Sequence, residues 1–201
     1  SRLRPEMPII AFTTEEKCYH QMALNWGVIP VLDKKWHMTE REAFQAISDH
    51  ALEKGYVHYG DLVVMTAGTP FGVAGTTNMM IVENIGDVLV RAYCGVGGRV
   101  SGEVALLFSA DVRNPYEVEG KIVVITKCND AYLPFLKNCK GVILENHMED
   151  IASEQYVLLV AKTLDIPAVV RSESSLKLLK EGQLVTVDPQ QALVFNGIVK
   201  G

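Results

Sequence analysis

The sequence is organised around residues 60–84, which read GDLVVMTAGTPFGVAGTTNMMIVEN. Leu62 to Met65 is a short apolar run without a polar residue on either face, a pattern typical of a strand that helices bury on both sides. A second apolar run, Met79 to Val82, follows a loop. We therefore predict that the first run lies deep in a sheet and that the second run returns and ends the first of two domains.

The loop between these two runs is rich in glycine and in hydroxyl side chains. From Gly68 to Thr77 it combines backbone N–H groups that glycine leaves accessible with threonine hydroxyls, and such a composition can hold a phosphate. For Thr76, Thr77 and Asn78 the alternative is a turn held by side-chain hydrogen bonds. The residues alone leave both interpretations open.

Composition and charge exclude several classes of function. The 201 residues are 48% hydrophobic and 21% charged, as in an ordinary globular protein. A net charge of −5 argues against a nucleic-acid surface, which needs clustered lysine and arginine. The four cysteines are widely spaced and no signal peptide is evident, so we expect reduced thiols in a cytoplasmic protein without a metal site. The apolar runs are too short for a membrane helix.

Two threonine–glutamate pairs predict where the first two helices begin. Thr13 with Glu16, and Thr39 with Glu42, have the spacing of a capping box, in which each side chain bonds the backbone of the other residue. Apolar residues recur at helical spacing after each pair.

Apolar runs before and between these helices predict strands at residues 8–12 and 28–32. Strands and helices that alternate with short connections require crossovers, so the sheet should be mostly parallel. We therefore expect a three-layer α/β domain over residues 1–86. Ligand sites in such sheets lie at the carboxyl ends of the strands, where the loop 68–77 follows.

After residues 85–87 the pattern changes, and residues 87–201 predict a second domain. Residues 88–92 and 102–107 predict two strands on either side of a glycine-rich segment. The chain then alternates again, with strands expected at 121–126, 141–144, 167–170, 184–187 and 192–195, helices at 130–138 and 151–164, and a short helix that Ser172 caps and that runs to Lys180.

The glycine-rich segment 95–102, GVGGRVSG, invites comparison with a dinucleotide-binding fingerprint. That fingerprint must open a helix, whereas this segment leads into another strand. We interpret it instead as a turn that lets two strands pack closely. The five histidines form no i, i+4 pair and none has metal-ligand spacing to a cysteine or carboxylate.

Several stretches together resemble a known family. The segments 1–5, 26–31, 60–64 and 75–78 look like the C-terminal domain of pyruvate kinase, and this resemblance covers residues 1 to about 86. The segments 166–170 and 181–188 resemble the extra C-terminal module of some bacterial pyruvate kinases, which is similar to the mobile phosphohistidine domain of phosphoenolpyruvate-utilising enzymes. The resemblance implies a swivelling β/β/α fold for the second domain.

The pyruvate kinase resemblance also implies where catalysis occurs. In the family a barrel domain binds phosphoenolpyruvate, ADP, Mg²⁺ and K⁺, and no part of this chain resembles that barrel. We therefore expect no catalytic residue, no metal and no other cofactor in this chain, and no activity of the chain alone. The catalytic domain of the same enzyme is the partner that the family implies.

The family further implies an effector site and a subunit interface. A phosphorylated metabolite binds between two loops, of which the one represented here comprises Pro70, Phe71, Gly72, Gly75, Thr76 and Thr77. A strand like residues 78–83 lies between C-terminal domains, so we expect a homo-oligomer. No nucleic acid or membrane is expected as a partner.

The second module departs from its relatives at the phosphorylated residue. Phosphohistidine domains carry Thr-Ser-His-Ala-Ala ten residues before an Ile-Pro pair, on the turn that enters a helix. Counting back ten residues from Ile166 gives Tyr156, and tyrosine, with a pKa of about 10, is a poor nucleophile at neutral pH. His147 is the only conceivable substitute. We expect a non-catalytic regulatory and assembly region, the alternatives being a phosphotransfer domain and a sensor of small phosphorylated molecules.

Overall fold

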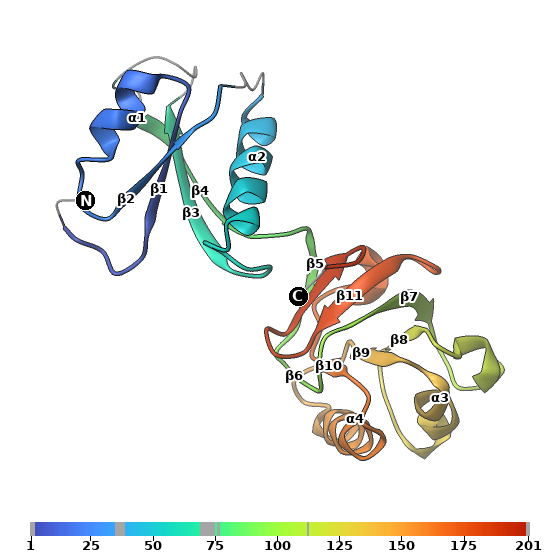
Figure 1. Cartoon of the computed structure of the whole chain (residues 1–201). Coiled ribbons are helices and arrows are strands. Elements are labelled where there is room, and N and C mark those ends of the chain that lie inside the picture. The colour runs from blue at the N-terminus through green and yellow to red at the C-terminus, as the bar shows by residue number, and fades with distance from the viewer. Residues whose placement is uncertain (1–2, 35–38, 69–74, 76, 112, 200–201) are drawn as a thin grey trace. The chain divides into compact units, whose positions relative to one another are not determined.

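The computed structural model describes residues 3–34, 39–68, 75, 77–111 and 113–199 (Figure 1). The chain divides into two compact units, Ser1–Ile85 and Gly86–Gly201. Both contain helices and strands, which confirms the predicted α/β class. A swivelling motion of the second domain stays a prediction of the resemblance.

The first unit begins with a parallel strand pair joined by a helix. Strand β1 (Ile9–Thr13) leads through α1 (Glu16–Met22) to β2 (Val28–Leu32), and the two strands pair in parallel with Ile9 opposite Val28. This confirms the crossover predicted for this part of the chain. Helix α2 (Glu40–Glu53) follows, and Phe12 of β1 meets His50 of α2 edge-on, with ring centroids 5.5 Å apart.

One of the two predicted capping boxes is present. The Thr39 hydroxyl accepts a hydrogen bond from the Glu42 N–H, and the Glu42 carboxylate accepts one from the Thr39 N–H, both at 3.2 Å. The box predicted at Thr13 and Glu16 is wrong, because Thr13 is still part of β1, where it pairs with Leu32. Its hydroxyl instead accepts from the Glu15 N–H, one residue before α1 begins.

The central stretch 60–84 forms an antiparallel hairpin rather than a buried parallel strand. Strands β3 (Leu62–Gly68) and β4 (Thr77–Asn84) pair with each other, with Val64 opposite Val82. The prediction of burial on both faces is wrong, because Leu62 and Val64 are 67% and 62% exposed. Within the described residues β3 pairs with β4 alone and only one face of the hairpin is covered. The described strands of this unit therefore form one parallel pair, β1–β2, and a separate antiparallel pair, β3–β4.

The second unit is built on one eight-stranded mixed sheet. Its strands lie in the order β5-β12-β11-β7-β8-β9-β10-β6, and the neighbours from β7 to β10 are parallel while the other pairs are antiparallel. The strands are β5 (Val88–Arg91), β6 (Cys94–Val96), β7 (Val100–Leu106), β8 (Ile122–Ile125), β9 (Gly141–Leu144), β10 (Ala168–Val170), β11 (Leu184–Asp188) and β12 (Leu193–Asn196). The helices are α3 (Leu133–Asn138), α4 (Ile151–Leu164) and α5 (Ser175–Leu178), with 3₁₀ turns at Pro115–Val118 and Asp130–Tyr132.

Alternate residues of the parallel strands enter two separate cores. Val123 and Ile125 of β8 pack in one cluster with Val157 of α4, whereas Ile122 and Val124 pack in another with residues of β11 and β12. Figure 1 accordingly shows α3 and α4 on one side of β8–β10 and β5 and β11 on the other. The helices therefore cover one face of the parallel strands, and the antiparallel strands of the same sheet cover the other face, so that the unit has three layers.

Three details differ from the sequence-based expectation for this unit. The helix expected at 130–138 is divided into a 3₁₀ turn and α3, whose first turn contains Pro134. An additional short strand, β6, lies within the glycine-rich segment and pairs with β10. Ser172 does not cap α5, which begins at Ser175 after Ser174, and the Ser172 hydroxyl instead lies 2.9 Å from that of Ser175.

Glycine is required within the glycine-rich segment by close packing. A Cβ atom at Gly95 in β6 would lie 2.7 Å from the Ala168 carbonyl oxygen and 2.7 Å from Pro189 Cβ. The backbone atoms of Ala168 and Pro189 cannot move aside as the end of a flexible side chain can. A larger residue at position 95 therefore has to displace β6. This agrees with the interpretation that the segment allows strands to pack closely.

We predict that Gly95→Ala lowers the free energy of unfolding of the second unit by about 1–3 kcal/mol, the usual cost of overpacking. The matched control is Gly98→Ala, because a Cβ atom at Gly98 meets nothing within 4 Å. Urea denaturation followed by circular dichroism measures both variants. Equal stability of the two variants would contradict the close approach at Gly95.

Candidate functional site

The predicted effector loop lies largely outside the described residues. Pro70, Phe71, Gly72 and Thr76 are not among them, whereas Gly75 has a φ of +82° and Thr77 begins β4. A phosphate cradle in this loop therefore stays a prediction. The site described below lies in the second unit, at the carboxyl ends of β9 and β10, where open parallel sheets bind their ligands.

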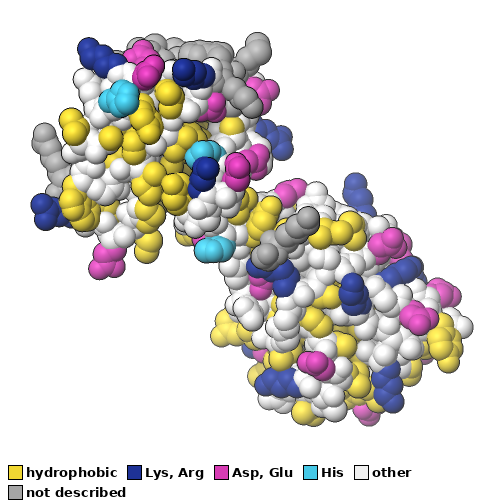
Figure 2. Space-filling view, in the orientation of Figure 1, with side chains coloured by type: hydrophobic (Ala, Val, Ile, Leu, Met, Phe, Trp, Pro, Cys, Tyr) yellow, Lys and Arg dark blue, Asp and Glu magenta, His cyan; other side chains and the backbone are white. Residues whose placement is uncertain are grey.

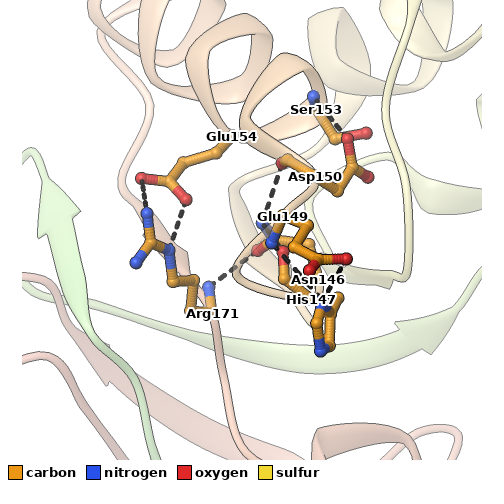
Figure 3. A network of polar contacts seen from close by, with 7 residues as sticks. All are labelled: Asn146, His147, Glu149, Asp150, Ser153, Glu154 and Arg171. Atoms are coloured by element: carbon orange, nitrogen blue, oxygen red, sulfur yellow. Dashed lines mark hydrogen bonds and ion pairs between the residues drawn. The ribbon is translucent and has the colours of Figure 1, made fainter.

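Asn146 connects three elements at this edge of the sheet. It follows β9 closely, and its Oδ1 accepts a hydrogen bond from the Arg171 N–H at 2.9 Å, directly after β10. Its Nδ2 donates to the Asp150 carbonyl at 3.1 Å, immediately before α4. Asp150 in turn caps α4 by accepting from the Ser153 N–H at 3.1 Å (Figure 3). The loop after β9, the start of α4 and the end of β10 are thereby held together.

Arg171 and Glu154 form an ion pair beside this connection. Arg171 Nε donates to Glu154 Oε2 at 2.6 Å and Nη2 donates to Oε1 at 3.2 Å, so the contact is bidentate (Figure 3). The Glu154 side chain is 11% exposed and that of Arg171 is 27% exposed. Bidentate pairs of this kind are the stronger charge-assisted contacts and also define orientation.

Arg171 has two further structural restraints. Its guanidinium carbon lies 4.5 Å from the centroid of the Tyr93 ring, a cation–π distance. Its φ of +52° is in the left-handed region, which costs a residue other than glycine conformational energy. The contacts of its backbone and side chain offset this cost.

The charges at this site are neutralised internally. The hydrogen bond to Glu154 raises the pKa of Arg171 above its ordinary value, so the guanidinium remains protonated. Burial raises the pKa of the neighbouring Cys94 thiol, and the Glu154 carboxylate adds to the effect. The thiol is therefore protonated at neutral pH, and it is not an activated nucleophile.

Tyr156, the residue at the phosphohistidine position, lies in the body of α4 and not on the turn that enters it. Burial raises its pKa to about 12, and a hydrogen bond with the Asp130 carboxylate adds to this shift. The phenol is therefore protonated at neutral pH. This supports the expectation that it does not take the place of the missing histidine as a nucleophile.

His147 lies in the loop ahead of α4, as predicted. Its Nδ1 accepts from the Glu149 N–H at 3.4 Å and lies 3.7 Å from the Glu149 carboxylate. Its side chain is 73% exposed. The two residues that the sequence singled out as phosphorylation candidates thus occupy different environments, one in solvent and one against Asp130.

Metal-ligating side chains do not gather in the part of the chain that the structure describes. Among the described residues no group of three His, Cys, Asp or Glu side chains could hold a metal ion. All four cysteines are free thiols, and burial raises the pKa values of Cys128 and Cys139 to about 12.

No helix in the described part of the chain has the length and hydrophobicity to cross a bilayer.

The sequence did not point to Asn146, Glu154 or Arg171. Asn146 and Arg171 each follow the carboxyl end of an apolar strand. That position was the one feature of the sequence that could have marked them as candidate site residues. Glu154 is 17 residues from Arg171, and no periodicity relates the two. Their pairing depends on how α4 packs beside β10.

Comparisons with known proteins agree with this architecture. The family model "Pyruvate kinase, alpha/beta domain" matches residues 1–83, and "PEP-utilising enzyme, mobile domain" matches residues 117–192. A pyruvate kinase of Sporosarcina psychrophila is 33% identical over 198 residues, 98% of this chain. The chain corresponds to the C-terminal region of pyruvate kinases. The family resemblance is thereby confirmed.

Other pyruvate kinases match over a similar extent. The enzyme of Lactobacillus delbrueckii subsp. bulgaricus is 36% identical over 200 residues, 99% of this chain. In both relatives the matched part is 33% of the whole protein, so the chain spans about a third of the length of these pyruvate kinases.

Solved structures show weaker likeness. A solution structure of Enzyme I has a TM-score of 0.35 with 22% identity, covering 42% of this chain and 34% of that one. A structure of MccF has a TM-score of 0.34 with 12% identity, covering 78% of this chain and 56% of that one. These TM-scores are too low to support an inference about fold or function.

We predict that Arg171→Ala lowers the thermal unfolding midpoint of the second unit by several degrees, because it leaves the nearly buried Glu154 carboxylate unpaired. The control is Arg113→Ala. The Arg113 side chain is similarly exposed, at 28%, but its partner Glu181 is 44% exposed, so solvent screens that pair and its loss costs little. Differential scanning calorimetry of both variants tests the difference, and equal shifts would contradict it.

Proposed function

We propose that this chain is the non-catalytic regulatory and subunit-assembly region of a pyruvate kinase, the glycolytic enzyme that transfers phosphate from phosphoenolpyruvate to ADP. The two family matches, in their order along the chain, support the relationship. The exposed apolar face of the β3–β4 hairpin supports the assembly role. The partner would be the catalytic domain of the same enzyme, which would bind Mg²⁺ and K⁺, in the cytoplasm.

The exposed face of the hairpin follows from its register. Alternate residues of a strand share a face, and directly paired residues of neighbouring strands lie on the same side. Val64 pairs with Val82 and Thr66 with Met80, so all four side chains lie on one face, together with Leu62.

The apolar members of this face are mostly in solvent. Leu62, Val64, Met80 and Val82 are 67%, 62%, 69% and 55% exposed, respectively. Figure 2 shows hydrophobic side chains gathered on the visible face of the first unit, with charged side chains around them. Because four adjacent apolar side chains on a strand pair favour removal from water, we propose that a second copy of the chain covers this face.

The rival functions receive less support. Phosphotransfer by the second unit needs an exposed nucleophile, and Tyr156 is protonated and half-buried. His147 is exposed, and its imidazole contacts the backbone N–H and the carboxylate of Glu149. Sensing of a phosphorylated metabolite depends on residues 70–77. That role is part of the regulatory function proposed here.

We predict that the purified chain is at least dimeric and that Met80→Glu shifts it toward the monomer, because a charge cannot be buried in an apolar contact without a large cost. Leu159→Glu on α4 is the control, since Leu159 is similarly exposed at 66% but belongs to the other unit. Size-exclusion chromatography with light scattering gives the masses. A monomeric wild-type chain at high concentration would overturn the assembly role.

We also predict that the chain alone does not produce pyruvate from phosphoenolpyruvate and ADP with Mg²⁺ and K⁺ present. A coupled lactate dehydrogenase assay detects pyruvate, and a full-length pyruvate kinase serves as the positive control. Turnover by the chain that survives repeated purification would refute its non-catalytic role.

A further inference from the structure

Arg171 at the carboxyl end of β10 is held in place by contacts that do not involve Glu154. Its backbone N–H donates to Asn146 Oδ1 at 2.9 Å, and Asn146 is itself anchored to the Asp150 carbonyl. Its guanidinium stacks over the Tyr93 ring at 4.5 Å. These contacts orient the guanidinium toward the first turns of α4 (Figure 3).

The Glu154 carboxylate has the geometry of a bound ligand. A guanidinium binds carboxylates and phosphates through two parallel N–H···O contacts, and Glu154 supplies both acceptor oxygens from within the chain. Glu154 is also the fourth residue of α4, near the helix N-terminus, where the helix dipole favours negative charge.

Solvent can reach the guanidinium once this carboxylate is removed. The Arg171 side chain is 27% exposed even with Glu154 in place, and the Tyr93 ring against which it stacks is 68% exposed. The Glu154 side chain, at 11% exposed, is the less accessible member of the pair. A small oxyanion entering from solvent would therefore find a fixed cation and an aromatic wall.

We propose that the Arg171 guanidinium, positioned by Asn146 and flanked by the Tyr93 ring, forms an oxyanion-binding site, and that the Glu154 carboxylate occupies it as an internal ligand. The ligands are small phosphates and carboxylates, because both can present two oxygen atoms that accept parallel N–H···O hydrogen bonds from a guanidinium. In the wild-type chain a free anion has to displace a carboxylate that is permanently beside the guanidinium. Binding is therefore weak unless Glu154 is removed or moved away.

The test compares the wild-type chain with Glu154→Ala, titrated with inorganic phosphate and separately with acetate at ionic strength held constant with sodium chloride. ¹⁵N NMR follows the Arg171 Nε–H and the backbone amides of Tyr93 and Asn146. We expect saturable shifts in Glu154→Ala with an affinity about tenfold or more above the wild type, because a charged hydrogen-bonding partner becomes available. The double variant Glu154→Ala/Arg171→Gln should lose them.

Glu154→Gln is the second variant if Glu154→Ala does not fold. It keeps the side-chain volume but removes the negative charge, and the same direction of change is expected. A folded variant of either kind without saturable shifts at Arg171 would overturn the proposal, as would equal shifts in the double variant. Phosphate binding without acetate binding, or the reverse, would identify which oxyanion the site accepts and would still support it.

Discussion

Burial on both faces of the parallel strands is the constraint on which the second unit depends. Strands β8 and β9 are fully buried, because α3 and α4 cover one face and the antiparallel strands cover the other. Every residue in these strands therefore has to be apolar or glycine. Polar groups are displaced to the strand ends, and that is where Asn146 and Arg171 are found.

The polar network at the carboxyl edge is a consequence of this layering. The loop after β9 and the residue after β10 leave the sheet at the same edge, next to the N-terminus of α4. Backbone groups that emerge there need partners, and Asn146 supplies them for Arg171 and Asp150. In the described residues no buried side-chain nitrogen or oxygen atom lacks a hydrogen-bond partner, so the edge is satisfied without a ligand.

The sequence predicted those features that depend on local pattern. The run 141–144 and the helix 151–164 were predicted with their observed bounds, since periodicity and length determine them. The run 62–65 has the same apolar character as 141–144, yet its alternate residues are exposed, because burial depends on which elements cover a strand and not on the strand itself. Thr13 and Thr39 likewise share a capping spacing, but only Thr39 lies outside a strand. The site pair Glu154–Arg171 could not be predicted, since only tertiary packing brings it together.

The two units differ greatly in how many side chains they bury. In the described part of the first unit the buried apolar side chains are Val31, Ala43, Phe44, Ala51 and Ile85, whereas the second unit contains two extensive buried clusters. The apolar area removed from water sets how much free energy opposes unfolding and how much denaturant is needed. The chain should therefore unfold in two separate transitions, the first unit before the second, and a two-state description with one midpoint applies to each unit and not to the whole chain.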